Sequence, residues 1–213
     1  MRKLIMKMSV SLDGFVSDAN GKNDWVFKSS DETSRAWSVG QTWEAGLIIM
    51  GRKTFESIAS YWPTAPGPFA PPMNEIPKAL FTKKGFKDVN PGHTSTSVKN
   101  AVSYNAVSGK LQNAEASPAE SSWGEAQVFE GDLAEGIREL KAGSGKPILA
   151  IGGAGFMQSL LATGLIDEYQ LIIHPVALGS GLPIFTGLSV PLHLKLVDVK
   201  TFPGGIVTHI YGN

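Results

Sequence analysis

Residues 45–60, AGLIIMGRKTFESIAS, change from one hydrophobic pattern to another within a few positions. Their first half is a short apolar run that ends at Gly51, which is typical of a strand buried on both faces. The second half has helical propensity and carries Phe55 and Ile58 on one face. The stretch therefore predicts a strand, a glycine turn and a helix in immediate succession.

The same succession recurs further along the chain. Strand and helix pairs are predicted at 126–143 and 147–164, and a helix over 31–41 with Ser30 as its N-cap. The segment 61–77 contains six prolines and is predicted to be a long loop. Further strands are predicted at 2–10, 78–84, 168–175, 193–202 and 205–212. Alternating strands and helices, closed by a hairpin, predict an α/β protein with a mostly parallel sheet and an antiparallel C-terminal edge.

The length of the chain suits one hydrophobic core. At 213 residues it can bury about 70% of its unfolded surface, so we expect a single domain over residues 1–213. Residues 88–122 are rich in Ser, Asn, Ala and Gly and show little apolar periodicity. They are predicted to form a peripheral insertion in this domain.

The composition argues against several classes of function. Nineteen basic residues balance nineteen acidic ones, so no net charge draws the molecule to nucleic acid or to an anionic membrane. The chain has no cysteine, and its four histidines are too scattered for a zinc site, so no metal is expected. Because it shows no signal-peptide pattern and no run of 18 apolar residues, we expect a cytoplasmic location.

Two glycine corners are candidates for binding an anion. Gly51, Arg52, Lys53 and Thr54 lie where a strand passes into a helix, and free N–H groups, a hydroxyl and a guanidinium there suit a phosphate. The alternative is an ordinary turn before a charged helix face. The second corner runs from a strand through four glycine-rich positions into a helix, at Gly152, Gly153, Ala154, Gly155 and Phe156. Its alternative is a tight packing corner.

A third candidate is the strand end Thr82-Lys83-Lys84. In a parallel sheet the carboxyl ends of the strands share one rim, so this end and both glycine corners could converge there. Two phosphate corners and a basic strand end describe a dinucleotide that carries an extra phosphate. A pair of lysines by itself is most often only solvated.

An ordered series of motifs along the chain resembles the dihydrofolate reductase superfamily, and more narrowly the C-terminal reductase domain of riboflavin biosynthesis proteins. The motifs are Ser11-Leu12-Asp13-Gly14, Asp24-Trp25, Gly51-Arg52-Lys53-Thr54-Phe55-Glu56, Tyr61-Trp62-Pro63, Ile151-Gly152-Gly153, Leu165-Ile166-Asp167-Glu168 and Pro175-Val176-Ala177-Leu178-Gly179. The resemblance implies a three-layer α/β/α fold, NADPH as the cofactor, and a homodimer.

The resemblance also implies roles for individual residues. Arg52, Lys53 and Thr54 would hold the 2′-phosphate and pyrophosphate of NADPH, with Thr82 and Lys83 near the adenosine. The corner from Gly152 to Phe156 would cradle the pyrophosphate, with an unusual peptide between the paired glycines. On the substrate side, Asp31 would be the catalytic carboxyl group and would need a raised pKa. Asp13 and Trp25 would lie near the substrate. Alternatively, Asp31 is an acid at the start of a helix, Asp13 stabilises a turn, and Trp25 only packs against its neighbours.

The resemblance predicts an NADPH-dependent reductase that transfers hydride to a small heterocyclic or carbonyl or imine substrate, like dihydrofolate reductase or 5-amino-6-(5-phosphoribosylamino)uracil reductase. The alternative is a protein that binds NADPH or a folate-like ligand as a sensor and has lost catalysis. A Rossmann dehydrogenase is set aside, because the turn after the first strand has no glycine fingerprint.

Overall fold

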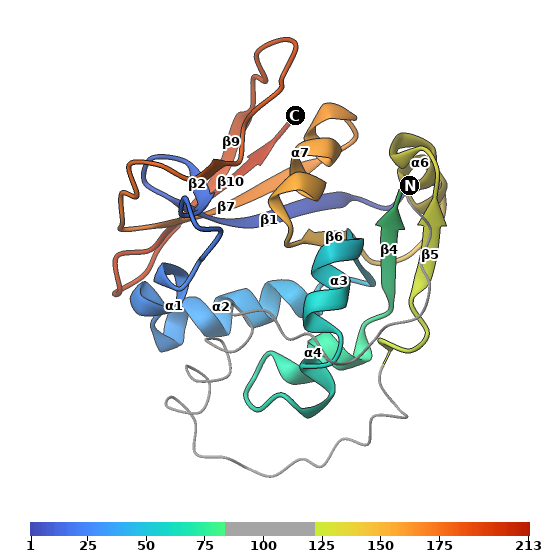
Figure 1. Cartoon of the computed structure of the whole chain (residues 1–213), viewed down its shortest axis with the longest axis horizontal. Helices are drawn as coiled ribbons and strands as arrows, with labels where there is room; N and C mark the ends of the chain where they lie inside the picture. The colour runs from blue at the N-terminus through green and yellow to red at the C-terminus, as the bar shows by residue number, and fades with distance from the viewer. Residues whose placement is uncertain (84–121) are drawn as a thin grey trace.

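An eight-stranded sheet forms the centre of the protein in the computed structural model, which describes residues 1–83 and 122–213 (Figure 1). Its strands follow the order β5-β4-β3-β6-β1-β7-β10-β9. Neighbours from β5 to β7 run parallel, whereas β10 is antiparallel to both β7 and β9. The strands are β1 (Leu4–Ser11), β3 (Leu47–Gly51), β4 (Lys78–Thr82), β5 (Gln127–Glu130), β6 (Ile148–Ile151), β7 (Glu168–His174), β9 (Lys195–Thr201) and β10 (Val207–Gly212). The predicted mostly parallel sheet with an antiparallel C-terminal edge is confirmed.

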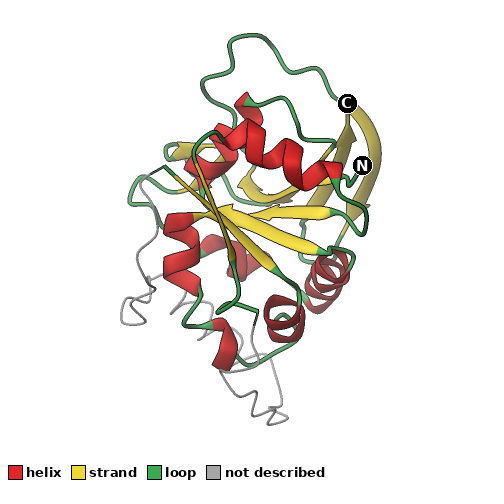
Figure 2. Ribbon diagram, turned by 90° about the vertical axis from the view of Figure 1, so that its right-hand side faces the viewer, coloured by secondary structure: helices red, strands yellow, loops and turns green. Residues whose placement is uncertain are grey.

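Helices cover both faces of this sheet (Figure 2). Helices α6 and α7 lie on one face, and α2, α3 and α4 lie on the other (Figure 1). The helices are α1 (Trp25–Ser29), α2 (Glu32–Trp43), α3 (Arg52–Ile58), η1 (Trp62–Thr64, a 3₁₀ turn), α4 (Ala70–Glu75), α6 (Leu133–Ala142) and α7 (Ala154–Ala162). A separate two-stranded sheet pairs β2 (Phe15–Ser17) with β8 (Leu182–Pro183). The expected three-layer arrangement is therefore present.

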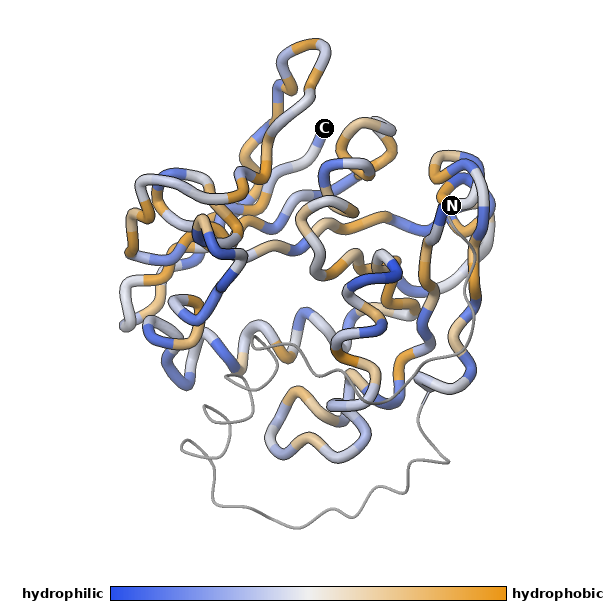
Figure 3. The backbone as a smooth tube through the Cα atoms, viewed as in Figure 1, coloured by the Kyte–Doolittle hydropathy of each residue, from blue (hydrophilic) through white to orange (hydrophobic). Residues whose placement is uncertain are grey.

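The central strands are buried on both faces because their apolar residues feed two hydrophobic clusters. On β3, Ile49 belongs to the cluster that contains Met157 of α7. Its neighbour Ile48 belongs to the cluster that contains Phe55 of α3. Successive side chains of a strand point to opposite faces, so an unbroken apolar run can fill both clusters. Figure 3 shows the hydrophobic residues concentrated along these central strands.

The loop predicted over 61–77 is partly wrong, because this segment contains η1 and α4. Proline is tolerated in the first turn of a helix, where its missing N–H group would have no partner in any case. Pro63 and Pro71 occupy such positions in η1 and α4. The N-cap of α2 is Asp31 rather than Ser30, and α1 precedes it without having been predicted.

The expected insertion at 88–122 lies outside the described residues except for Ser122. The backbone N–H of Ser122 donates to the carbonyl oxygen of Asn74 at 2.9 Å, and its hydroxyl accepts from Lys78 Nζ at 2.8 Å. Trp123 follows in the core, 5.4 Å from Phe55 between ring centroids. The chain thus re-enters the core at Ser122, while the single domain and the insertion stay predictions.

Across residues 1–83 and 122–213, no helix combines the length and the apolar character needed to cross a bilayer.

Candidate functional site

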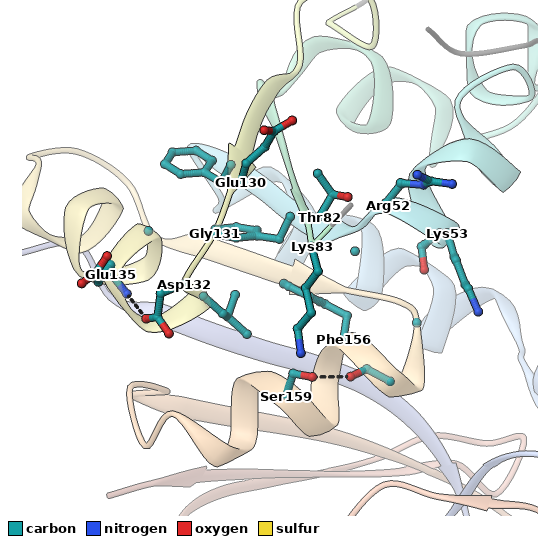
Figure 4. Close-up of a pocket in the computed structure, with 18 of the residues that line it drawn as sticks. Arg52, Lys53, Thr82, Lys83, Glu130, Gly131, Asp132, Glu135, Phe156 and Ser159 are labelled. Atoms are coloured by element: carbon teal, nitrogen blue, oxygen red, sulfur yellow. Dashed lines mark hydrogen bonds between the residues drawn. The ribbon is translucent and has the colours of Figure 1, made fainter. Parts of the chain in front are cut away.

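The carboxyl ends of the parallel strands β3, β4, β5 and β6 lie along one edge of the sheet and border a cavity of about 660 Å³, here named the charged cavity (Figure 4). Ligands of open α/β sheets bind at this edge. Nine residues singled out from the sequence line it: Gly51, Arg52, Lys53, Thr54, Thr82, Lys83, Gly153, Gly155 and Phe156. The structure thus brings the three candidate segments together, while Lys84 lies outside the described residues. Their roles in binding stay predictions.

The paired glycines between β6 and α7 have an unusual backbone. Gly152 and Gly153 both have positive φ angles, 65° and 61°, and the peptide bond between them is trans. A Cβ atom on Gly153 would lie 2.4 Å from Thr54 Oγ1, and one on Gly152 would lie 2.8 Å from Thr54 Cγ2. The pair therefore allows α3 to pack tightly against the corner, which is the packing role considered above. Gly155 differs, because a Cβ atom there would meet nothing within 4 Å.

The N-terminus of α7 opens onto the charged cavity. None of the described side chains caps this helix, so its first N–H groups and the positive end of its dipole face the cavity and suit an anion. Gly155 and Phe156 of its first turn line the cavity. The ring of Phe156 stacks on Phe81 at 5.7 Å, and Phe81 stacks on Phe129 at 5.0 Å. A flat apolar wall therefore lies beside a site that suits a phosphate.

Charged side chains of opposite sign line the charged cavity. Figure 4 shows Arg52 and Lys53 on one side of it, Glu130 and Asp132 on the other, and Lys83 between them. The cations come from the start of α3 and the end of β4, and the acids from the last residue of β5 and the N-cap of α6. An anionic group is therefore favoured on the α3 side, and a hydroxyl-rich group on the α6 side.

The acidic side was missed from the sequence, although the signal was present. Residues 130–133, EGDL, follow a strand and contain a glycine and then Asp132, which caps α6 by accepting from the N–H of Glu135 at 2.9 Å. Gly131 has a φ of 100°, which favours glycine. This is a third strand, glycine and helix corner at the same rim.

A second cavity, of about 600 Å³, lies between the sheet and helices α1 and α2 and is named here the aromatic cavity. Strands β1, β7 and β10 contribute Lys7, Ser9, His174 and Thr208, and helices α1 and α2 cover it. Its aromatic side chains are Phe27, Trp37, Tyr61, Trp62, Phe69 and Phe202. Gly153 lines both cavities, so the two meet at the glycine corner.

Lys7 is a buried cation in the aromatic cavity. Its Nζ donates to the carbonyl oxygen of Ser38 at 2.7 Å and lies 5.8 Å from the ring centroid of Trp37. Burial lowers the pKa of Lys7 from its ordinary value to about 7. Among the described residues, no carboxylate forms an ion pair with it. Lys7 was not among the predicted site residues. A lysine within the apolar strand LIMKMSVS is nevertheless unusual and indicates a functional or paired cation.

Several polar atoms of the aromatic cavity have no partner within the part of the chain that the structure describes. They are the indole N–H groups of Trp37 and Trp62, the hydroxyl of Thr208 and the Oδ1 atom of Asn23, and all are buried. Unpartnered buried polar atoms are costly, and they are expected where a ligand or water completes the bonding. The cavity is thus suited to a ligand with several hydrogen-bond acceptors.

His174 closes the aromatic cavity at the end of β7 and is 1% exposed. Its Nδ1 atom lies 2.7 Å from Ser29 Oγ, and its Nε2 atom lies 3.1 Å from Ser9 Oγ. Burial lowers the pKa of His174 to about 4, so the ring is neutral near pH 7. His174 is therefore hydrogen-bonded at both ring nitrogens, and one of its partners, Ser9, lines the cavity.

The expectation that Asp31 is a catalytic acid with a raised pKa is wrong. Asp31 is the N-cap of α2, where its Oδ1 accepts from Thr33 Oγ1 at 2.6 Å and from the N–H of Ser34 at 2.8 Å. Its Oδ2 also accepts from the N–H of Gly204. These donors hold the pKa of Asp31 well below its ordinary value. Asp31 lines neither cavity.

Asp13 and Trp25 are also absent from the lining of both cavities. Asp13 ties two loops together: it accepts from Ser11 Oγ at 2.5 Å and from the N–H of Gly179 at 2.7 Å, and these bonds lower its pKa to about 2. Trp25 is buried and meets His174 edge to face at 5.3 Å. Both residues have the structural roles that were the alternatives to substrate contact.

The chain is similar to known proteins over nearly its whole length. A family model described as the RibD C-terminal domain matches residues 2–208. The uncharacterized protein YyaP of Bacillus subtilis (strain 168) is 28% identical over 210 residues, which cover 99% of this chain and 94% of YyaP. The uncharacterized protein YwjB of the same organism is 25% identical over 209 residues, which cover 98% of this chain and 97% of YwjB.

Solved structures share the fold at lower sequence identity. A putative riboflavin biosynthesis protein from Shewanella sp. PV-4 is 20% identical, with a TM-score of 0.67, and the match covers 100% of this chain and 98% of that one. A diaminohydroxyphosphoribosylaminopyrimidine deaminase/5-amino-6-(5-phosphoribosylamino)uracil reductase from Thermotoga maritima is 16% identical, with a TM-score of 0.62. That match covers 99% of this chain and 56% of the Thermotoga protein.

Proposed function

Because the chain belongs to the RibD C-terminal domain family and has the dihydrofolate reductase-like fold of such proteins, we propose that it is an NADPH-dependent reductase. Its substrate is a small heterocyclic or carbonyl compound with an electron-poor C=N or C=O bond. NADPH, when bound, supplies the hydride from C4 of its nicotinamide ring. The protein aligns the two reactants and excludes water.

One observation carries this proposal: two cavities of different chemistry meet at Gly153. The charged cavity has cations and an uncapped helix N-terminus for phosphates, and a wall of phenylalanine rings. The aromatic cavity has rings, a buried lysine and unpartnered donors for a flat polar molecule. A dinucleotide that crosses the corner would place its adenosine end in the first cavity and its nicotinamide end in the second.

The residues that would hold NADPH follow from this placement. Gly155 leaves open space at the first turn of α7 for the pyrophosphate. Arg52, Lys53 and Lys83 would bind the 2′-phosphate on the cationic side of the charged cavity. Thr54 would act mainly by holding the glycine corner in place, since its side chain fills the space beside Gly153.

The lining of the aromatic cavity favours a substrate that is rich in acceptors. Lys7 and Arg35 line it, and none of the described residues that line it is Asp or Glu. The indole N–H groups of Trp37 and Trp62 add two unpartnered donors. The site therefore favours ring carbonyl oxygens or an anionic group and lacks a carboxylate to bind a protonated pterin.

The experiment is anaerobic oxidation of NADPH, followed at its absorbance band, with a panel of acceptors. The panel contains 5-amino-6-(5-phosphoribosylamino)uracil, 7,8-dihydrofolate and 4-nitrobenzaldehyde. We expect turnover with the acceptor-rich pyrimidine compound, and slower turnover or none with dihydrofolate. Tight NADPH binding without turnover of any acceptor would favour the alternative of a non-catalytic sensor. The absence of NADPH binding would contradict the reductase and an NADPH sensor, and would leave only a sensor of a folate-like ligand.

A further inference from the structure

His174 is held between two serine hydroxyls in a buried chain of hydrogen bonds. Ser29, the last residue of α1, lies 2.7 Å from Nδ1, and Ser9 of β1 lies 3.1 Å from Nε2. Ser29 is half-buried, whereas Ser9 and His174 line the aromatic cavity. The chain therefore runs from a partly accessible helix end to the floor of the substrate cavity.

The directions of the two hydrogen bonds are coupled through the tautomer of the imidazole. A neutral imidazole donates from one nitrogen and accepts at the other. If Ser29 donates to Nδ1, then Nε2–H donates to Ser9 Oγ, and the Ser9 O–H group is left to point into the aromatic cavity. Burial opposes a second proton on the ring. The ionisable residues of the neighbouring helix α1 are its N-cap Asp24 and Lys28 of its last turn.

We propose that Ser29, His174 and Ser9 form a proton relay whose last member, Ser9, donates to the acceptor in the aromatic cavity. The inference rests on the proposed function, since reduction of a C=N or C=O bond consumes one proton for each hydride. No other described hydroxyl in this cavity is bonded to an imidazole that has a second partner. His174 and Ser29 act through Ser9 and position its proton.

The balance of the step is simple. The hydride forms the new C–H bond, the C=N or C=O π pair moves to the heteroatom, and that atom takes the Ser9 hydroxyl proton. Ser9 Oγ takes the proton of Nε2, Nδ1 takes the Ser29 hydroxyl proton, and Ser29 takes one from water. NADPH leaves as NADP⁺. The reverse shift, after water replaces the product in the cavity, restores the starting tautomer of His174.

The first test reads the tautomer directly and needs no substrate. Long-range ¹H–¹⁵N correlation spectra of ¹⁵N-labelled protein, with the His174 signals assigned by loss in His174→Gln, distinguish Nε2–H, Nδ1–H and imidazolium forms. We expect a neutral Nε2–H ring at about pH 7, and a shift toward Nδ1–H in Ser29→Ala, because Nδ1 loses its donor. A wild-type ring that is Nδ1–H or imidazolium overturns the relay.

The second test uses the acceptor of the panel that the wild-type enzyme reduces fastest. Ser9→Ala and His174→Gln should lower kcat about 100-fold, the scale of general acid catalysis, and leave the Kd of NADPH unchanged. Ser9→Thr keeps the hydroxyl and should restore most of kcat. His209→Gln is the matched control, since His209 lies on β10, bonds Tyr211 and lines neither cavity.

The two tests separate the relay from the reductase proposal. Unchanged kcat in both Ser9→Ala and His174→Gln, in an enzyme that oxidises NADPH, overturns the relay and leaves the reductase intact. If the protein reduces no acceptor, the reductase proposal fails, and the relay fails with it as a source of protons for substrate. The spectra then show whether the three residues keep the arrangement as a purely structural chain.

Discussion

The charged cavity and the aromatic cavity meet at one glycine, yet they are built in different ways. The charged cavity uses main-chain N–H groups at the start of α7 and charged side chains at the ends of strands and the start of α3. The aromatic cavity uses aromatic rings, the buried cation Lys7, and several buried polar atoms that have no partner among the described residues. The charged cavity therefore suits binding of a common cofactor. The aromatic cavity suits selection of the substrate and its reduction, because unpaired buried groups discriminate strongly between ligands.

The largest effect should come from blocking the charged cavity at α7. Gly155→Glu places a carboxylate in the open space of the first helical turn, where it competes with a phosphate for the same N–H groups. We expect the affinity for NADPH to fall about 100-fold or more, since it loses charge-assisted hydrogen bonds and gains repulsion. Fluorescence titration measures this.

Gly40→Glu is the matched control, because Gly40 is also an exposed helical glycine with nothing within 4 Å of a new Cβ atom. Its NADPH affinity should equal that of the wild type. If Gly155→Glu binds NADPH as tightly as Gly40→Glu does, the charged cavity does not hold the pyrophosphate.

Lys7→Met should affect substrate binding in the aromatic cavity more than cofactor binding in the charged cavity. Removing the buried cation should lower kcat/KM for an anionic or acceptor-rich substrate about 10- to 100-fold, the loss of one hydrogen bond to a charged group. The Kd of NADPH should change less, because its phosphates and adenosine would lie in the charged cavity, which Lys7 does not line. Steady-state kinetics and titration together test this, and an equal loss for both ligands would show that the cavities are not separate in function.

The same variant should change the pH dependence of stability. The pKa of Lys7 is about 7 in the folded protein, against 10.5 for a free lysine, so between these values the unfolded chain binds more protons. The free energy of unfolding of the wild type therefore rises with pH across this window. Lys7→Met lacks this contribution and should be the more stable protein at pH 7, with a flatter rise, in urea denaturation. A rise as steep as that of the wild type would contradict the buried charge.

A smaller effect is expected from one cation of the charged cavity. Lys83→Ala should reduce the preference for NADPH over NADH about 10-fold, because a single partly exposed contact to the 2′-phosphate is lost. The Kd of NADH should not change. Lys28→Ala, which removes an exposed lysine that lines neither cavity, is the control. If both variants keep the wild-type ratio, the 2′-phosphate is not bound by Lys83.

Formation of the predicted homodimer should affect ligand binding in the aromatic cavity more than in the charged cavity. Leu196, Val197 and Val199 of the edge strand β9 are 51%, 63% and 43% exposed, and β9 pairs with β10, which carries Thr208. An exposed apolar edge strand favours pairing with a second chain. Val197→Lys should yield a monomer by light scattering, with KM for the substrate raised a few-fold. A wild-type monomer at micromolar concentration would show that this edge needs no partner.

Removal of most of the predicted insertion should have the smallest effect on stability and on ligand binding. Replacing about residues 92–120 with a short Gly/Ser linker keeps the anchors at Ser122 and Trp123 and should change the free energy of unfolding by less than about 1 kcal/mol. Both cavities should keep their affinities. Loss of either affinity alone would assign the segment to that cavity, and a failure to fold would show that the segment belongs to the core.

The difference between the cavities also explains how much could be predicted from the sequence. The strand, glycine and helix corners at Gly51 and Gly153 are local patterns, and parallel strands bring their ends to one rim without further information. The corner at Gly131 follows the same pattern and could have been found. The mostly parallel sheet and its antiparallel edge follow from the same alternation of patterns, whereas the order of the strands was not predicted.

The aromatic cavity could not be assembled in this way. Its residues come from the inward positions of β1, β7 and β10 and from helices far apart in the chain, and no local spacing links Lys7 to Trp37 or to His174. Asp31 was assigned wrongly for the same reason: its place near the start of a helix fits both an N-cap and a buried acid. Only the donors from Thr33 and Ser34 decide between the two.

The central claim is that NADPH crosses the glycine corner from the charged cavity into the aromatic cavity. A crystal structure of the complex with NADPH tests it most directly. The account predicts the adenosine near Thr82 and Lys83, the pyrophosphate at the first turn of α7 beside Gly155, and the nicotinamide C4 in the aromatic cavity within reach of a ligand on Ser9. NADPH bound with its adenosine in the aromatic cavity, or bound outside both cavities, would contradict it.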